Sequence, residues 1–117
     1  VGNTWGEMES MREVLVFDAA TGDWYRQPTT ADDDNYPNGR WTFCMVAASA
    51  PDNSSHNIYM YGGEFEGEVT SEPRSDMWIL TVPAFHWLRV NVDSQPRKAH
   101  SCTTVGQRYM LSYGGTR

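Results

Sequence analysis

The sequence predicts an all-β fold. Three observations support this: helix signals are nearly absent, short apolar runs alternate with turn residues, and two parts of the chain repeat the same landmarks in the same order. The 117 residues include 10 glycines and 6 prolines, and the apolar residues come in short runs separated by turn residues. Hydrophobic residues make up 39% of the chain and aromatic residues 13%, so there is enough apolar material for a packed core.

Each apolar run is bounded by residues that favour turns, as is typical of strands. The first run is followed by an Asp- and Gly-containing turn at 18–23, and a polar connection at 27–40 separates the second strand from the third. Pro51 begins the next loop, an acidic loop covers 64–76, and Pro83 marks a tight turn. The predicted strands are 14–17, 24–25, 41–48, 58–61, 77–82, 85–92, 100–105 and 109–113.

An internal repeat organises these strands. Residues 14–24 (VLVFDAATGDW) align without gaps on residues 77–87 (MWILTVPAFHW). Two further landmarks recur in the same order, an arginine that opens a strand (Arg40, Arg97) and a glycine pair that ends an aromatic strand (Gly62-Gly63, Gly114-Gly115). The spacing of roughly 50 residues predicts one four-stranded sheet per repeat, which is the period of a propeller blade.

These landmarks resemble the kelch repeat of β-propellers. The resemblance rests on the Arg97-x-x-His100 pattern, on the glycine pairs after an aromatic strand, and on the later tryptophans Trp24 and Trp87, and it covers essentially the whole chain. Finer details are similar to secreted or membrane-anchored kelch-repeat proteins of fungi. These details lie at 40–44, 80–87, 100–102 and 106–110.

The resemblance implies a partial propeller. We expect residues 13–27 to supply the outer strands of one blade, residues 40–92 a complete blade, and residues 97–115 the inner strands of the next. Known propellers have 4 to 8 blades. The chain also starts at Val1 rather than Met, so we expect it to be a segment of a longer protein or to close its ring with other copies.

Most repeated residues are expected to be structural. The glycine pairs lack the helix start and the following Lys or Ser/Thr of a phosphate loop, so we expect them to provide positive φ or close backbone approach. The resemblance implies that Arg40, Arg97 and His100 form hydrogen bonds within and between blades. Because Trp24 and Trp87 recur at the repeat period, we expect them to pack between blades rather than to bind sugars.

The irregular loops are the predicted binding regions, because propeller loops carry function while blades supply rigidity. The two longest and least repeated loops cover 27–39 and 64–74. Their candidate ligand residues are Tyr36, Phe65 and Glu66, and Trp5 is another loop aromatic.

No catalytic, metal or cofactor site is predicted. His56, His86 and His100 show no spacing that suggests a zinc site, and Asp32-Asp33-Asp34 lacks the alternating ligands of a calcium loop. No serine lies in a Gly-x-Ser-x-Gly elbow. Some kelch-type enzymes are copper-radical oxidases, and a fragment of such an enzyme is the alternative function.

The cysteines Cys44 and Cys102 fit either one disulfide or two buried thiols. Asn53-Ser54-Ser55 matches an N-glycosylation acceptor. The fungal resemblance and this acceptor both point to an oxidising compartment, which favours the disulfide and a secreted or extracellular location.

The charge balance excludes some partners. Nine basic residues against fifteen acidic ones give a net charge of −6, and Lys98 is the single lysine. This predicts no nucleic-acid partner, and no run approaches the roughly 20 apolar residues that cross a bilayer. The resemblance and the irregular loops imply a non-enzymatic module whose loops bind a protein or a cell-wall glycan.

Overall fold

A computed structural model of the chain describes residues 10–65 and 72–117, and within these ranges it contains strands and no α-helix. Each of the eight predicted strands overlaps a long strand of the structure, which confirms the all-β fold. No helix in the described part is long and apolar enough to cross a membrane. The long strands are β1 (Glu13–Asp18), β2 (Asp23–Pro28), β5 (Cys44–Ser49), β6 (His56–Tyr61), β8 (Met77–Val82), β9 (His86–Val90), β10 (Ser101–Val105) and β11 (Tyr109–Tyr113).

Three short strands and one 3-10 turn complete the structure. They are β3 (Thr30–Ala31), β4 (Arg40–Trp41), β7 (Glu64–Phe65) and η1 (Asp32–Asp34). The connection predicted to be irregular at 27–40 thus contains β3 and η1, because β3 pairs in parallel with β9 through Thr30 and His86. The predicted strand 41–48 is divided, because Thr42 has φ of 55° and turns β4 away from β5 to pair with β7.

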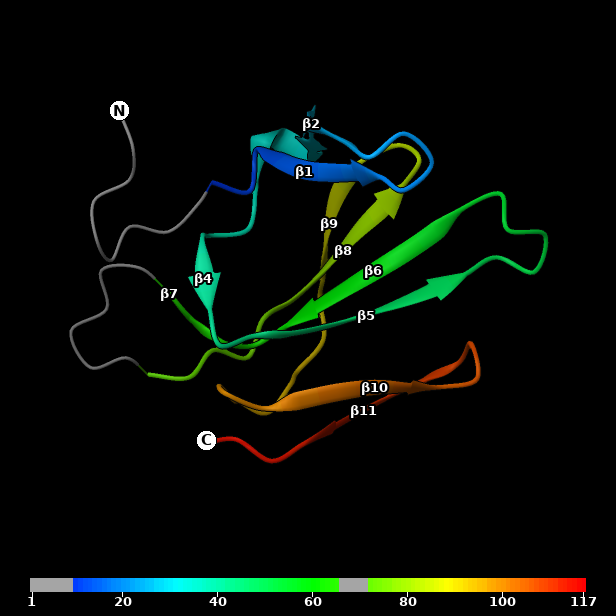
Figure 1. The fold of residues 1–117 in the computed structure, drawn as a ribbon. Helices are drawn as coiled ribbons and strands as arrows, with labels where there is room; N and C mark the ends of the chain where they lie inside the picture. Colours follow the sequence, from blue (N-terminus) through cyan, green and yellow to red (C-terminus); the bar gives the residue numbers. More distant parts are fainter. Residues whose placement is uncertain (1–9, 66–71) are drawn as a thin grey trace.

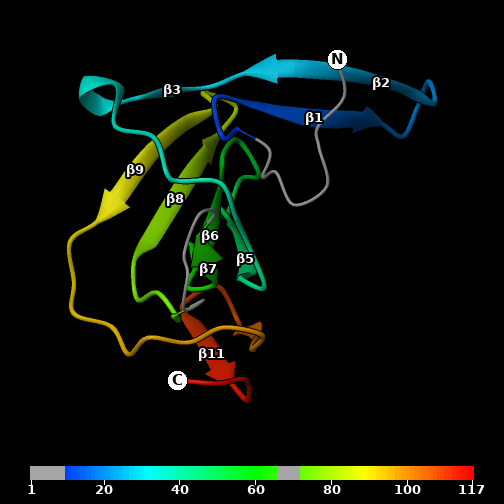
Figure 2. The same ribbon diagram turned by 90° about the vertical axis from the view of Figure 1, so that its left-hand side faces the viewer.

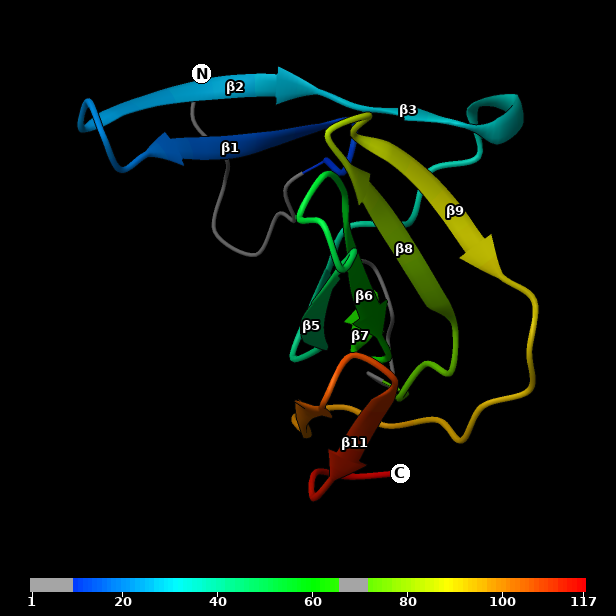
Figure 3. The same cartoon turned by 90° about the vertical axis from the view of Figure 1, so that its right-hand side faces the viewer.

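The strands form a central sheet flanked by two hairpins (Figure 1). The central sheet has the order β3-β9-β8-β6-β5, in which β5, β6, β8 and β9 pair antiparallel with one another and β3 pairs in parallel with β9. The β1–β2 hairpin lies across one end of this sheet and the β10–β11 hairpin lies at the other (Figures 2 and 3). β5, which forms one edge of the central sheet, lies against β10.

The repeat of the sequence is also a repeat of hydrogen bonds. Arg40 donates from Nη1 to the carbonyl of Gly62 at 3.2 Å, and Arg97 donates from Nη1 to the carbonyl of Gly114 at 2.7 Å. The β4–β7 pair has its counterpart in the bridge between Lys98 and Thr116. Each unit therefore joins its arginine-led segment to its own glycine pair.

The core lies between the central sheet and the β1–β2 hairpin. Trp78 and Leu80 alternate along β8, so they share a face, and they pack with Met60 and Trp87. Val14 of β1 packs against this cluster. Full burial of one such side chain contributes about 1.5–3 kcal/mol, so these few residues supply much of the stability of the sheet.

One of the two repeated tryptophans is buried in this structure and the other is exposed. Trp87 is 2% exposed and donates from Nε1 to the carbonyl of Met11, whereas Trp24 is 65% exposed. The counterpart of Trp78, Leu15, is also 65% exposed. The reason is that the equivalent face of the central sheet packs against Val14, Ala31 and Tyr36, whereas the described residues leave this face of β1 and β2 exposed.

The glycine pairs are required by both conformation and space. Gly62, Gly63, Gly114 and Gly115 all have φ between 73° and 94°. A Cβ on Gly63 would lie 2.6 Å from the Trp41 carbonyl, and one on Gly115 would lie 2.4 Å from the Lys98 carbonyl. The second glycine of each pair therefore lets two backbone segments approach closely.

This geometry predicts that Gly63→Ala destabilises the chain more than Gly22→Ala. Both glycines have positive φ, 94° and 81°, but a Cβ on Gly22 would meet nothing within 4 Å. The backbone collision at Gly63 should add about 1–3 kcal/mol to the conformational cost that the two variants share. Urea unfolding of the two variants measures this difference. Equal losses would contradict the role of close approach.

Candidate functional site

A buried ion pair organises one end of the central sheet. The Arg40 guanidinium, whose side chain is 0% exposed, donates to both carboxylate oxygens of Asp76 at 2.8 and 2.9 Å. It also donates to the carbonyl of Asn38, and Trp78 donates from Nε1 to Asp76 at 2.8 Å. Burial alone would raise the pKa of Asp76, but the hydrogen bonds from Arg40 and Trp78 and the charge of Arg40 outweigh burial and hold this pKa below its ordinary value.

Guanidinium groups cover the aromatic rings around this ion pair. The Cζ atoms of Arg40 and Arg74 each lie 4.4 Å from the ring centroid of Phe65. Arg12 lies over the ring of Tyr36 at 4.3 Å. These contacts are cation–π interactions, which hold both partners in place.

A cavity of about 210 Å³ opens between these groups, and we refer to it as the arginine cavity. Two arginines, Arg74 and Arg89, line this cavity, and Asp76, which also lines it, is paired with Arg40. Its lining residues are Asn35, Tyr36, Asn38, Phe65, Arg74, Ser75, Asp76, Trp78 and Arg89.

The structure places two of the predicted ligand residues, Tyr36 and Phe65, together in the arginine cavity, although they are 29 positions apart in the sequence. Glu66 and Trp5 lie outside the described residues. Tyr36 also donates its hydroxyl hydrogen bond to the carbonyl of Thr29 at 3.0 Å. Guanidinium groups lie over both rings, which reduces the aromatic surface that a sugar could stack on.

Sequence reasoning missed Arg89, and the repeat contains the signal that reveals it. Arg89 is the counterpart of Arg26, which pairs with Glu13 across the β1–β2 hairpin. The counterpart of Glu13 is Asp76, but this carboxylate is turned to Arg40. Arg89 lies with its Cζ 5.8 Å from the ring centroid of Trp78 and forms no ion pair with any described residue.

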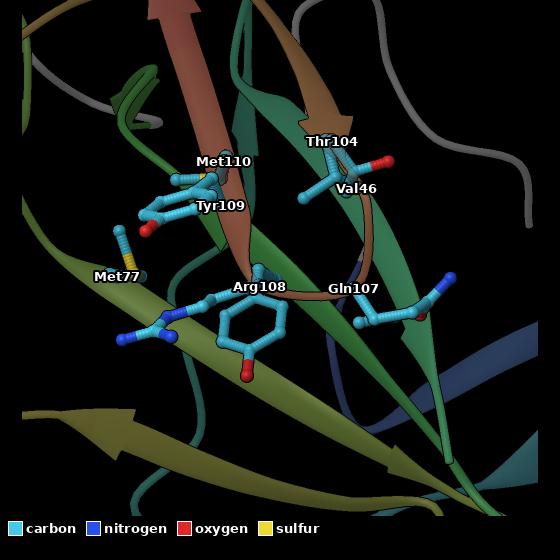
Figure 4. Close-up of a pocket in the computed structure, with 9 residues that line it drawn as sticks. Val46, Met77, Thr104, Gln107, Arg108, Tyr109 and Met110 are labelled. Carbon is cyan, nitrogen blue, oxygen red and sulfur yellow. The ribbon is translucent and has the colours of Figure 1, made fainter. Parts of the chain in front are cut away.

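A second cavity, of about 250 Å³, lies between the central sheet and the β10–β11 hairpin (Figure 4). Side chains of the hairpin, including Tyr109 and Met110, reach across it toward Met77 and Val46. Met77 is the counterpart of Val14, which packs against the core from the preceding hairpin. The mostly apolar lining and this equivalence indicate a surface for blade-to-blade packing.

A disulfide between Cys44 and Cys102 joins the start of β5 to the start of β10, and the two Cα atoms lie 5.7 Å apart. The disulfide alternative of the sequence analysis is therefore confirmed. The ring of His100 lies beside it, and its Nε2 donates to the carbonyl of Tyr61 at 3.1 Å. Burial lowers the pKa of His100, so the ring is neutral near pH 7. The short spacing between His100 and Cys102 was the signal for this cluster, and the sequence analysis overlooked it.

Asn53, the predicted glycosylation site, is exposed in the turn between β5 and β6. An exposed turn is accessible to a glycosylating enzyme, and glycosylation of Asn53 stays a prediction.

Asp76→Asn should destabilise the chain by about 3–5 kcal/mol, because it leaves a buried guanidinium without its counterion. The folded pKa of Asp76 lies below its ordinary value of 3.8, so the stability that it contributes is fully present above pH 3.8 and is lost as the pH falls through the folded pKa. The gap between wild type and variant in urea unfolding should therefore shrink as the pH falls below 3.8 toward the folded pKa of Asp76. A gap independent of pH would contradict this.

Thiol labelling of the denatured, unreduced chain should detect no free thiol, and labelling after reduction should detect both. Cys44 and Cys102 close a loop with a sequence separation of 58. Chain entropy predicts that reduction costs about 4 kcal/mol of stability, measured by urea unfolding with and without reductant. Two reactive thiols in the unreduced chain would contradict the disulfide.

Comparisons with known proteins agree with the repeat. No family model matches the chain. A curated protein of the fungus Arthroderma benhamiae, described as a "Kelch repeat-containing protein", is 34% identical over 120 residues, which cover 97% of this chain. The chain spans 17% of the length of that relative. Taken with the all-β sheets and the repeated contacts between arginines and glycine pairs, this match shows that nearly the whole chain is similar to one segment of a kelch-repeat protein, and it supports a fold of kelch-type propeller blades.

Proposed function

We propose that the chain is a non-enzymatic kelch module that binds a partner protein, and that the arginine cavity receives an acidic side chain of this partner. The observation that carries the proposal is Arg89, a guanidinium at the cavity wall without a carboxylate partner among the described residues. Arg26, at the equivalent place in the β1–β2 hairpin, has such a partner in Glu13.

The cavity suits one acidic side chain better than a large ligand. Its volume of about 210 Å³ is below the roughly 300–1,000 Å³ of pockets for drug-sized molecules. A guanidinium presents a planar fork that binds a carboxylate through two hydrogen bonds. Asp76, paired with Arg40, accepts a hydrogen bond from the indole nitrogen of Trp78 and so fixes the position of this ring. The Arg89 guanidinium lies over the ring of Trp78.

A glycan is the second candidate, because the amides of Asn35 and Asn38 in the cavity lining are groups that bind sugar hydroxyls. Three guanidinium groups lie over the rings of Tyr36 and Phe65, which disfavours the stacking that sugars commonly use.

The oxidase alternative has less support. A copper-radical oxidase uses a cysteine crosslinked to a tyrosine, and both cysteines of this chain are joined to each other. An extracellular location is part of the proposal, supported by the disulfide and by the exposed acceptor at Asn53.

We also propose that the chain packs against further propeller blades or against other copies of itself. Leu15, Phe17 and Trp24 form an exposed apolar face on the β1–β2 hairpin, while their counterparts in the central sheet, Trp78, Leu80 and Trp87, are buried. The face that is buried in the central sheet is thus exposed in the hairpin and available to a neighbouring sheet.

Arg89→Gln should weaken binding of an acidic peptide by at least about tenfold, since a hydrogen bond to a charged group contributes about 1.5–3 kcal/mol. The measurement is an array of acidic peptides, with Asn/Gln analogues beside them, followed by titration of the best binder. Arg26→Gln is the matched control, because Arg26 occupies the equivalent place on another hairpin.

Three outcomes would overturn the proposal. They are equal binding of the Asn/Gln analogue, equal loss in both variants, and capture of oligosaccharides with no peptide bound. The last outcome, seen on an array of neutral and uronic-acid oligosaccharides, would favour the glycan.

A further inference from the structure

Three potential metal ligands meet where the central sheet contacts the β10–β11 hairpin. The sulfurs of Cys44 and Cys102 and a ring nitrogen of His100 all lie within 4.8 Å of one another. Cys44 lies at the start of β5, while His100 and Cys102 lie at the start of β10. The cluster therefore joins two sheets.

One nitrogen of His100 has a lone pair that no described group uses. A carbonyl oxygen accepts only, so Nε2 must carry the hydrogen that it donates to Tyr61. Nδ1 is then the unprotonated nitrogen, and it is buried without a hydrogen-bond partner. A metal-binding histidine has this arrangement, with one nitrogen donating to a backbone carbonyl and the other free for the metal.

The histidine ring is also held rigidly. A Cβ on Gly62 would lie 2.7 Å from its Cε1, and a Cβ on Gly115 would lie 2.8 Å from its Cβ, so two glycine pairs enclose the residue. The ring of Tyr61 packs edge-on at a centroid distance of 5.1 Å. His100 is 7% exposed and Cys44 is 7% exposed, while Cys102 is half-buried and leaves an open side.

We propose that Cys44, His100 and Cys102 form a redox-dependent zinc site, which binds Zn²⁺ when the disulfide is reduced and loses it when the disulfide forms again. A dithiol reductant supplies two electrons and two protons: the S–S bond breaks, two thiols form, and the reductant becomes a cyclic disulfide. Zn²⁺ then displaces the two thiol protons and binds two thiolates and the histidine nitrogen. A low-molecular-weight disulfide reverses the sequence, takes up the two electrons as thiols and expels the metal.

The ligand set and the geometry favour zinc. Thiolate and imidazole are the ligands of zinc sites with three protein ligands, where water fills the fourth position. A Zn–S bond of about 2.3 Å and tetrahedral angles place two bound sulfurs about 3.8 Å apart. Cα atoms 5.7 Å apart allow this after side-chain rotation alone. The contact between β5 and β10 would thus be cross-linked in either redox state.

The proposal predicts one zinc ion per reduced chain and none per oxidised chain. The chain is reduced with a phosphine, equilibrated with zinc and analysed by native mass spectrometry, with affinity measured against a chromophoric chelator. His100→Ala should weaken zinc binding by at least about tenfold, since even a lost supporting contact of a metal ligand costs about 10- to 100-fold. His56→Ala is the matched control, because His56 instead bonds Ser49 at 2.7 Å.

A measurement on the unaltered chain covers the case in which a variant fails to fold. Zinc should slow alkylation of both thiols in the reduced chain at least about tenfold, a chelator should restore the rate, and the β-sheet circular dichroism should persist. The proposal is overturned by zinc uptake of the oxidised chain, by absence of uptake in the reduced chain, or by uptake only after loss of β-structure. Equal affinity in a folded His100→Ala variant would also overturn it.

Discussion

The Arg40 guanidinium is the group on which most of the described structure depends. It is fully buried, and burying a charge is costly unless it is paired and hydrogen-bonded. Asp76, Gly62 and Asn38 supply these bonds, and the ring of Phe65 covers the guanidinium. These contacts come from β4, β7 and the segment before β8, so the burial of one charge determines how three parts of the chain meet.

The glycine pairs extend this arrangement from one sheet to the next. Gly63 donates its backbone hydrogen bond to the carbonyl of Arg97 at 2.8 Å, and Gly62 lies against His100. The second arginine-led segment thus touches the first glycine pair as well as its own. The central sheet and the β10–β11 hairpin are thus joined by backbone hydrogen bonds between their connecting segments, and the disulfide adds a covalent link at the same place.

The sequence predicts the repeated part of the fold because local chemistry determines it. Short apolar runs predict the strands, and Gly, Pro and Asp residues between them predict the turns. The glycine pairs are recognised because they recur in the same order among the other landmarks. Three features depend on distant partners and could not be read in this way. Asp76 pairs with Arg40, which lies 36 positions away in the sequence. The redox state of Cys44 depends on its distance from Cys102. The exposure of Trp24 depends on which other strands pack against it.

Arginines at equivalent positions of the two units differ in whether they stabilise the fold or lie at the arginine cavity. Arg40 and Arg97 contact the glycine pairs of their own units, so these repeated cations are committed to the fold. Arg26 and Arg89 are also equivalent, but only Arg26 has its carboxylate. The difference arises because Asp76 serves the buried Arg40, for which a lost partner would cost more than for an exposed arginine. Because Asp76 pairs with Arg40, Arg89 lies at the cavity wall without a carboxylate partner among the described residues. This difference between two copies of one unit makes this end of the sheet suited to an acidic partner.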